Sequence, residues 1–266
     1  MGKNDSSKCR VAPMMRYMLE NKSDLVRLLG VMDIDASITD LKDEDIYFGE
    51  KNALTDEKGE KQLIPSCEYL CRLIEELPAN SFAIGKINNS QSSDTTNIRR
   101  KLINDEKERK KATEYIKNHY SSLPDDYKGV YYLEGSSKPD VFIETLDKVI
   151  VIEGKWTESM PTEVTTYCDK RNQMVRHIHD ALNYVRRSGH EKQVFGFYIV
   201  ADLFAKEWEG AISILGFADK LLSQYGIEDE IDSIRTAYKG YITWEQIVQM
   251  FPGVVDQSCG WKENAD

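Results

Sequence analysis

The chain of 266 residues lacks the long apolar run that a membrane-spanning helix requires. Its longest apolar runs, such as Val149–Ile152 and Phe195–Ala201, are far shorter than the ~20 residues needed to cross a bilayer. The first eight residues are polar and contain no apolar centre of a secretory signal. We therefore expect a cytoplasmic protein that does not engage a membrane.

Cysteine is scarce, with five residues in the whole chain. The count is odd and no secretory signal is present, so a disulfide framework is not expected. Cys67 and Cys71 lie four positions apart in a segment with helical periodicity, but two further zinc ligands at comparable spacing are missing. We expect these cysteines to be buried thiols.

Several motifs of common enzyme classes are missing too. No glycine-rich loop matches a P-loop or a dinucleotide-binding fingerprint, and no serine-hydrolase elbow is present. The chain carries 35 Lys and Arg against 45 Asp and Glu, for a net charge of −10. This balance argues mildly against a general polyanion binder, although the local distribution of charge decides contact with a partner.

The hydrophobic pattern divides the chain into three parts. Residues 1–95 are expected to form a mostly helical extension, and the polar stretch 88–97 is the predicted linker that follows it. Residues 96–202 are the predicted core, and residues 203–266 a helical C-terminal extension in which 203–251 form broken helices.

The predicted core begins with one helix and then changes to a strand period. It has an α/β or α+β composition, with a mixed sheet of four or more strands flanked by helices. The last predicted strand is nearly all apolar and is therefore placed inside the sheet. In chain order the expected elements are a helix over Ile98–Tyr120, strands over Tyr127–Glu134, Lys138–Leu146 and Lys148–Thr157, a helix over Thr162–Arg187 and a strand over Gln193–Ala201.

Charged residues follow the most apolar of these strands. Side chains alternate between the two faces of a strand, so Glu153 and Lys155 share a face with Val151. Ionised groups at the end of such a strand are unfavourable unless they have partners or a function. This pattern marks the end of the strand as a candidate functional site.

The preceding strand brings a second carboxylate to the same place. A hairpin that turns at residues 147–148 would pair Phe142 with Val151. In that register Asp140 lies beside Glu153. Adjacent carboxylates repel one another unless a cation lies between them, and oxygen ligands suit Mg²⁺ or Mn²⁺.

A nearby lysine adds to this chemistry, because it can orient a metal-bound water or stabilise charge on a phosphate. The sequence Pro139-Asp140 followed by Glu153-Gly154-Lys155 resembles the PD-(D/E)xK motif of restriction-endonuclease-like nucleases. The order helix, three strands, helix, strand also resembles the common core of that fold. The resemblance implies that Asp140 and Glu153 are metal ligands and that Lys155 is the catalytic lysine.

The resemblance covers roughly residues 98–202, and it implies a further carboxylate from the first core helix. Glu108 is the candidate because it lies near the apolar stripe of that helix, and Glu106 and Glu114 compete with it. The alternative for each of the three is a solvated helix glutamate.

The helix after the motif offers further polar residues. Gln173 and His177 share a face at a spacing of four, with Arg176 beside them. By resemblance, Gln173 would hold a metal-bound water or backbone, His177 would do the same or carry a proton, and Arg176 would contact a phosphate. Lys170 and Arg171 are weaker phosphate candidates. The alternative is an amphipathic helix with a polar outer face.

Together these features predict a Mg²⁺-dependent or Mn²⁺-dependent nuclease. The resemblance favours DNA over RNA, an endonuclease of restriction or defence type, and a possible homodimer. One alternative is an inactive module of the same fold that binds nucleic acid or a protein partner. Another is an unrelated α/β protein in which Glu153 and Lys155 form a plain surface ion pair.

Overall fold

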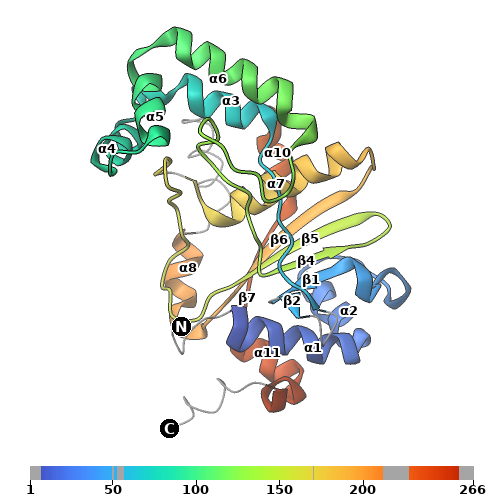
Figure 1. Cartoon of the computed structure of the whole chain (residues 1–266). Helices are drawn as coiled ribbons and strands as arrows, with labels where there is room; N and C mark the ends of the chain where they lie inside the picture. Colours follow the sequence, from blue (N-terminus) through green and yellow to red (C-terminus); the bar gives the residue numbers. More distant parts are fainter. Residues whose placement is uncertain (1–6, 50, 53–56, 170, 212–227, 258–266) are drawn as a thin grey trace.

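The computed structural model describes residues 7–49, 51–52, 57–169, 171–211 and 228–257. These residues form an α+β arrangement with a five-stranded sheet, helices on both of its faces, and a helical lobe beyond one face (Figure 1). Every helix among them is too short or too polar to span a bilayer.

The sheet is open and mixed. Its strands are β1 (Ile46–Phe48), β4 (Val141–Glu144), β5 (Lys148–Gly154), β6 (Gln193–Val200) and β7 (Tyr238–Thr243), and they lie side by side in that order. The β1–β4 and β4–β5 pairs are antiparallel, whereas the β5–β6 and β6–β7 pairs are parallel. A separate hairpin joins β2 (Lys51–Asn52) to β3 (Glu57–Lys58).

Both faces of the sheet are covered, as the apolar strands require. On one face, α7 (Gln173–Ser188) packs against Val149 and Val151, and α10 (Glu228–Ala237) lies beside it. On the other face, Ile150 and Ile152 join a core built from three helices. These helices are α1 (Ala12–Glu20), α2 (Lys22–Val31) and α11 (Trp244–Met250). The predicted alternation of β5 is therefore confirmed.

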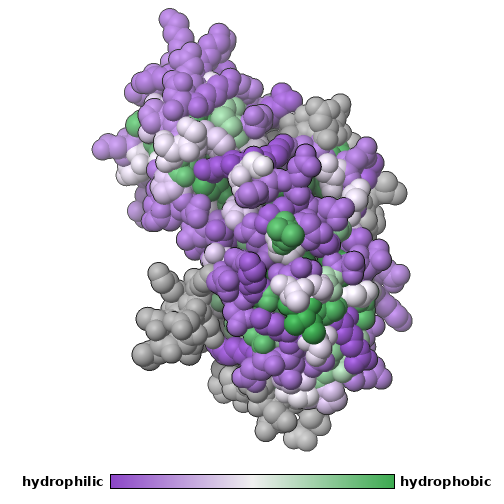
Figure 2. Space-filling view, turned by 90° about the vertical axis from the view of Figure 1, so that its right-hand side faces the viewer, coloured by the Kyte–Doolittle hydropathy of each residue, from purple (hydrophilic) through white to green (hydrophobic). Residues whose placement is uncertain are grey.

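The helical lobe lies beyond α7, at the top of Figure 1. It consists of α3 (Cys67–Glu75), α4 (Ser81–Asn89), α5 (Asp94–Asn104) and α6 (Glu106–His119), and α3 packs lengthwise on α6. The lobe has its own apolar core, which includes Leu70, Leu102 and Ile116. Figure 2 shows that the outer surface is mostly hydrophilic at the top of that view.

The helix predicted over Ile98–Tyr120 is in fact two helices. Asp105 separates α5 from α6, and its carboxylate accepts hydrogen bonds from the N–H groups of Lys107 (2.9 Å) and Glu108 (3.3 Å). A carboxylate at this position caps the start of a new helix. The predicted linker at 88–97 is likewise mostly helical, because α4 ends at Asn89 and α5 begins at Asp94.

Other predicted elements also differ from the structure. Residues 127–134 are irregular and contain no strand, and the helix predicted from Thr162 begins only at Gln173. Two strands come from the flanking parts, since β1 lies within 1–95 and β7 within 203–266. Both flanks therefore contribute to the sheet, and neither is a purely helical addition to a complete core. A short helix, α8 (Ala205–Ala211), follows β6.

Candidate active site

The hairpin register brings the two predicted carboxylates together. Phe142 pairs with Val151, as the sequence predicts, and Asp140 immediately precedes β4. The backbone nitrogen of Asp140 lies 3.4 Å from Glu153 Oε2, and the backbone N–H of Gly154 donates to Asp140 Oδ2 at 2.8 Å. Asp140 and Glu153 are both buried, so the site lies at the protected end of two paired strands.

Lys155 follows directly and is held at both ends. Its Nζ lies 3.1 Å from Glu153 Oε1. Its backbone N–H donates to the carbonyl of Ile199 at 2.7 Å, and its own carbonyl accepts from Trp244 Nε1 at 2.9 Å. The pairing with β6 therefore extends past Glu153 and fixes the backbone that carries the lysine.

The start of α7 supplies two more side chains. Gln173 Nε2 donates to Glu153 Oε1 at 2.7 Å, and His177 Nε2 lies 3.2 Å from Glu153 Oε2. The carbonyl oxygen of Asn172 caps this helix by accepting the N–H of Met174 at 3.0 Å. The predicted helix face thus reaches Glu153, and the cap fixes the point from which it does so.

The charges of the three central groups depend on one another. Burial opposes ionisation of Glu153, but His177 and Lys155 outweigh burial and hold the pKa of Glu153 below its ordinary value. Burial and the charge of Glu153 raise the pKa of Asp140 well above 3.8. Burial would lower the pKa of Lys155, but the carboxylate of Glu153 raises it. The site therefore combines an ionised glutamate, a charged lysine and an aspartate that resists ionisation.

The oxygen donors suit a divalent cation. Two carboxylates lie side by side, and the raised pKa of Asp140 shows that the charge of Glu153 opposes its ionisation. A cation between the two would remove this repulsion. Within the described ranges, no group of three or more His, Cys, Asp and Glu side chains is arranged to hold a metal ion. The residues fit a cation as a pair of ligands, not as a complete protein cage, which is usual for Mg²⁺.

Glu108 does not reach this site. It lies on α6, where Lys111 is its ion-pair partner at 3.8 Å, and α6 packs on α3 in the lobe, away from β5 (Figure 1). Its competitors are no closer, because Glu106 pairs with Lys110 and Glu114 is exposed on the same helix. The predicted helix carboxylate is therefore not part of the cluster around Glu153.

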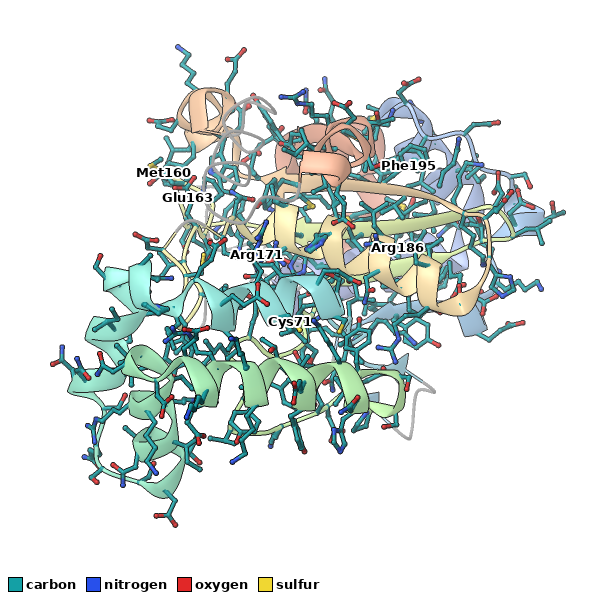
Figure 3. All side chains as sticks on the ribbon, turned by 90° about the horizontal axis from the view of Figure 1, so that it is seen from above. Cys71, Met160, Glu163, Arg171, Arg186 and Phe195 are labelled. Atoms are coloured by element: carbon teal, nitrogen blue, oxygen red, sulfur yellow. The ribbon has the colours of Figure 1, made fainter. Side chains whose placement is uncertain are left out.

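Arg171 is not available to a phosphate, contrary to prediction. It is 1% exposed and lies between α7 and α3 (Figure 3). Its Nε is 3.3 Å from Glu134 Oε1, its Nη2 is 3.5 Å from Asp180 Oδ1, and its guanidinium stacks on the ring of Tyr69. Burial with two carboxylates satisfies this arginine inside the protein, so its role is structural.

Arg176 is also engaged within the chain. Its Nε is 3.1 Å from Glu134 Oε1, and Nη2 donates to the carbonyls of Gly135 (2.8 Å) and Ser136 (3.1 Å). These contacts fasten the segment before β4 to α7, which helps to place Asp140. The third phosphate candidate, Lys170, lies outside the described residues.

One acidic residue near the site is missing from the sequence prediction. The negative charge of Glu60 acts on Asp140, adding to the effects of burial and Glu153 that raise the pKa of Asp140. Glu60 comes close because Leu63 forms an isolated antiparallel bridge with Ser137, three residues before Asp140. No local pattern around Glu60 signals this contact, since it depends on the pairing of distant segments.

No protein-family model matches the chain, and neither a curated protein nor a solved structure matches it. The case for a function therefore rests on the residues gathered around Glu153.

Proposed function

We propose that the chain is a metal-dependent nuclease that hydrolyses phosphodiester bonds, with DNA as its expected substrate and an endonuclease of restriction or defence type as its class. The observation that carries the proposal is the convergence of Asp140, Lys155 and Gln173 on Glu153. Such a group of carboxylates beside a charged lysine is the equipment that metal-assisted phosphodiester hydrolysis requires.

The order of elements supports the same proposal. The succession α2, β1, β4, β5, α7 and β6 has the helix, three strands, helix, strand order of the PD-(D/E)xK core. The first three strands are neighbours and antiparallel, and β6 returns parallel to β5 after α7. The helical lobe then lies in the connection between β1 and β4.

Each residue has a definite part in the proposed chemistry. Asp140 and Glu153 would hold the cation, which when bound makes a water molecule more acidic and offsets negative charge on the phosphate. Lys155, kept protonated by Glu153, offers a fixed positive charge and hydrogen-bond donors to a phosphate oxygen or the attacking water. Gln173 and His177 hold the Glu153 carboxylate in place from α7.

A cleavage assay with purified full chain tests the proposal. Linear and circular DNA, single-stranded and double-stranded, and a labelled RNA are incubated with Mg²⁺ or Mn²⁺ and, separately, with EDTA. We expect cleavage of DNA that EDTA abolishes and that is lost in Asp140→Asn. Asp147→Asn, at the turn far from the site, is the matched control and should cleave as the native chain does. Cleavage of circular DNA would indicate an endonuclease.

One observation favours a second candidate, an inactive module of the same fold that binds nucleic acid or a protein partner. Three groups of the chain itself already engage Glu153, and the described residues offer no third metal ligand in place. This candidate predicts binding without cleavage under every metal condition. Retained binding to DNA together with intact substrates would decide in its favour.

A further inference from the structure

A short segment of the chain runs beside the strand that leads to Asp140. Leu63 and Ser137 exchange two backbone hydrogen bonds, from Leu63 N–H to the Ser137 carbonyl at 2.9 Å and from Ser137 N–H to the Leu63 carbonyl at 2.8 Å. This is the pattern of a hydrogen-bonded antiparallel pair. Residues 60–63 therefore approach residues 137–140 in opposite directions.

The register of this bridge predicts which side chains face each other. Counting three residues from Leu63 and from Ser137 in the antiparallel sense brings Glu60 opposite Asp140. Opposite residues of an antiparallel pair share a face. The hydrogen bond from Ser136 Oγ to Gln62 Oε1, at 3.1 Å, shows that even-numbered side chains of the two segments do meet.

The electrostatics agree with this placement. Glu60 is half-buried, and its charge is felt by the Asp140 carboxyl together with burial and Glu153. The chain turns at Gly59, whose φ of 75° is in the left-handed region that favours glycine. The turn ends the segment that carries Glu60 along the strand.

Polar atoms around Glu153 point to a missing ligand independently of the acidic residues. His177 is 2% exposed, and neither of its ring nitrogens makes a well-formed hydrogen bond within the described structure. The buried Oε1 of Gln173 is in the same situation, although the Nε2 of that side chain is bonded to Glu153. Buried polar atoms are normally satisfied, so a bound ion with its water molecules would complete this site.

We propose that Glu60 is a third acidic group of the cation site, supplied by the segment before α3 and facing Asp140 and Glu153. The inference rests on the proposed function, because it assumes that the two carboxylates hold a divalent cation. It adds a residue from outside the core hairpin, so the site draws on three separate parts of the chain. The role of Glu60 is to raise the affinity for the cation.

Titration with Mn²⁺ tests this directly, by calorimetry and by the electron paramagnetic resonance of the free ion, in the absence of nucleic acid. Glu60→Gln removes the charge and keeps the shape, and we expect its Kd for Mn²⁺ to rise roughly 10- to 100-fold. Glu68→Gln, an exposed glutamate on α3, is the matched control and should bind as the native chain does. Circular dichroism and thermal melting establish that each variant is folded.

The outcomes separate this inference from the proposed function. Native affinity in Glu60→Gln, with Mn²⁺ bound by the native chain and released in Asp140→Asn, overturns the role of Glu60 alone. Failure of the native chain itself to bind Mn²⁺ overturns both. If Glu60→Gln melts several degrees lower, Glu60→Asp replaces it, and an unchanged affinity in Glu60→Asp and in folded Glu60→Gln at lower temperature overturns the inference.

Discussion

The backbone N–H of Gly154 donates a 2.8 Å hydrogen bond to Asp140 Oδ2, which fastens the aspartate of one strand to the strand that carries Glu153. The contact places the two carboxylates side by side without a turn of side chain between them. It also sets a steric requirement, because residue 154 is closely packed on its other side. The spacing of the acidic pair thus depends on a residue that has no side chain.

The first prediction concerns Gly154→Ala. A Cβ at this position would overlap Val11 Cγ2 and lie 3.1 Å from Trp244 Cζ2, so the surrounding core must shift. We expect the free energy of unfolding to fall by about 1–3 kcal/mol, measured by denaturant unfolding. Gly85→Ala, on α4 with open space around it, is the control and should be neutral or slightly stabilising. Equal effects of the two substitutions would show that close packing at Gly154 is not required.

The second prediction is a pH dependence set by Asp140. In the folded chain its pKa is raised well above 3.8, whereas the unfolded chain releases this proton near its ordinary pKa. The unfolded state therefore binds fewer protons between these two pKa values, so this group makes stability fall as pH rises through that window. Asp140→Asn removes the effect and still accepts the Gly154 hydrogen bond.

Melting temperatures in EDTA from pH 4 to pH 8 check this sign. The variant should gain on the native chain as pH rises, and added Mg²⁺ should restore the native chain while leaving Asp140→Asn unchanged. An Asp140→Asn variant that is less stable by the same amount at every pH would contradict the raised pKa.

The third prediction concerns the buried arginine. Arg171→Met leaves the carboxylates of Glu134 and Asp180 buried without their main partner, and this should lower the free energy of unfolding by about 3–5 kcal/mol. Arg72→Met, which removes a solvent-exposed pair with Glu76, should change it by less than about 1 kcal/mol. A stable Arg171→Met variant that binds DNA less tightly would restore the phosphate role and contradict the structural one.

The part of the site that lies on one hairpin is predictable from sequence. Alternation along β5 and a tight turn determine a register, and the register brings Asp140 beside Glu153. The face of α7 that carries Gln173 and His177 is also predictable, because a spacing of four places both residues on one side. Local periodicity is enough for these contacts.

Contacts between distant segments are not predictable in this way. Ile46–Phe48 is too short to show a strand period, and β7 contains Gly240 with a φ of 82°, which obscures its pattern. The helix face alone also cannot distinguish an arginine that reaches a phosphate from one that, like Arg171, is neutralised by Glu134. Glu60 depends on the Leu63–Ser137 bridge, which no neighbouring residue announces.

The most direct measurement of the central claim is the rate of metal-dependent DNA cleavage by Lys155→Ala, compared with Lys148→Ala as control. Both lysines belong to the same stretch of chain, but Lys148 begins β5 and pairs with Asp147, whereas Lys155 lies 3.1 Å from Glu153. The account predicts that Lys155→Ala lowers the rate about 100- to 1000-fold and that Lys148→Ala retains it. Equal cleavage by native chain and Lys155→Ala, with both proteins folded, would contradict it.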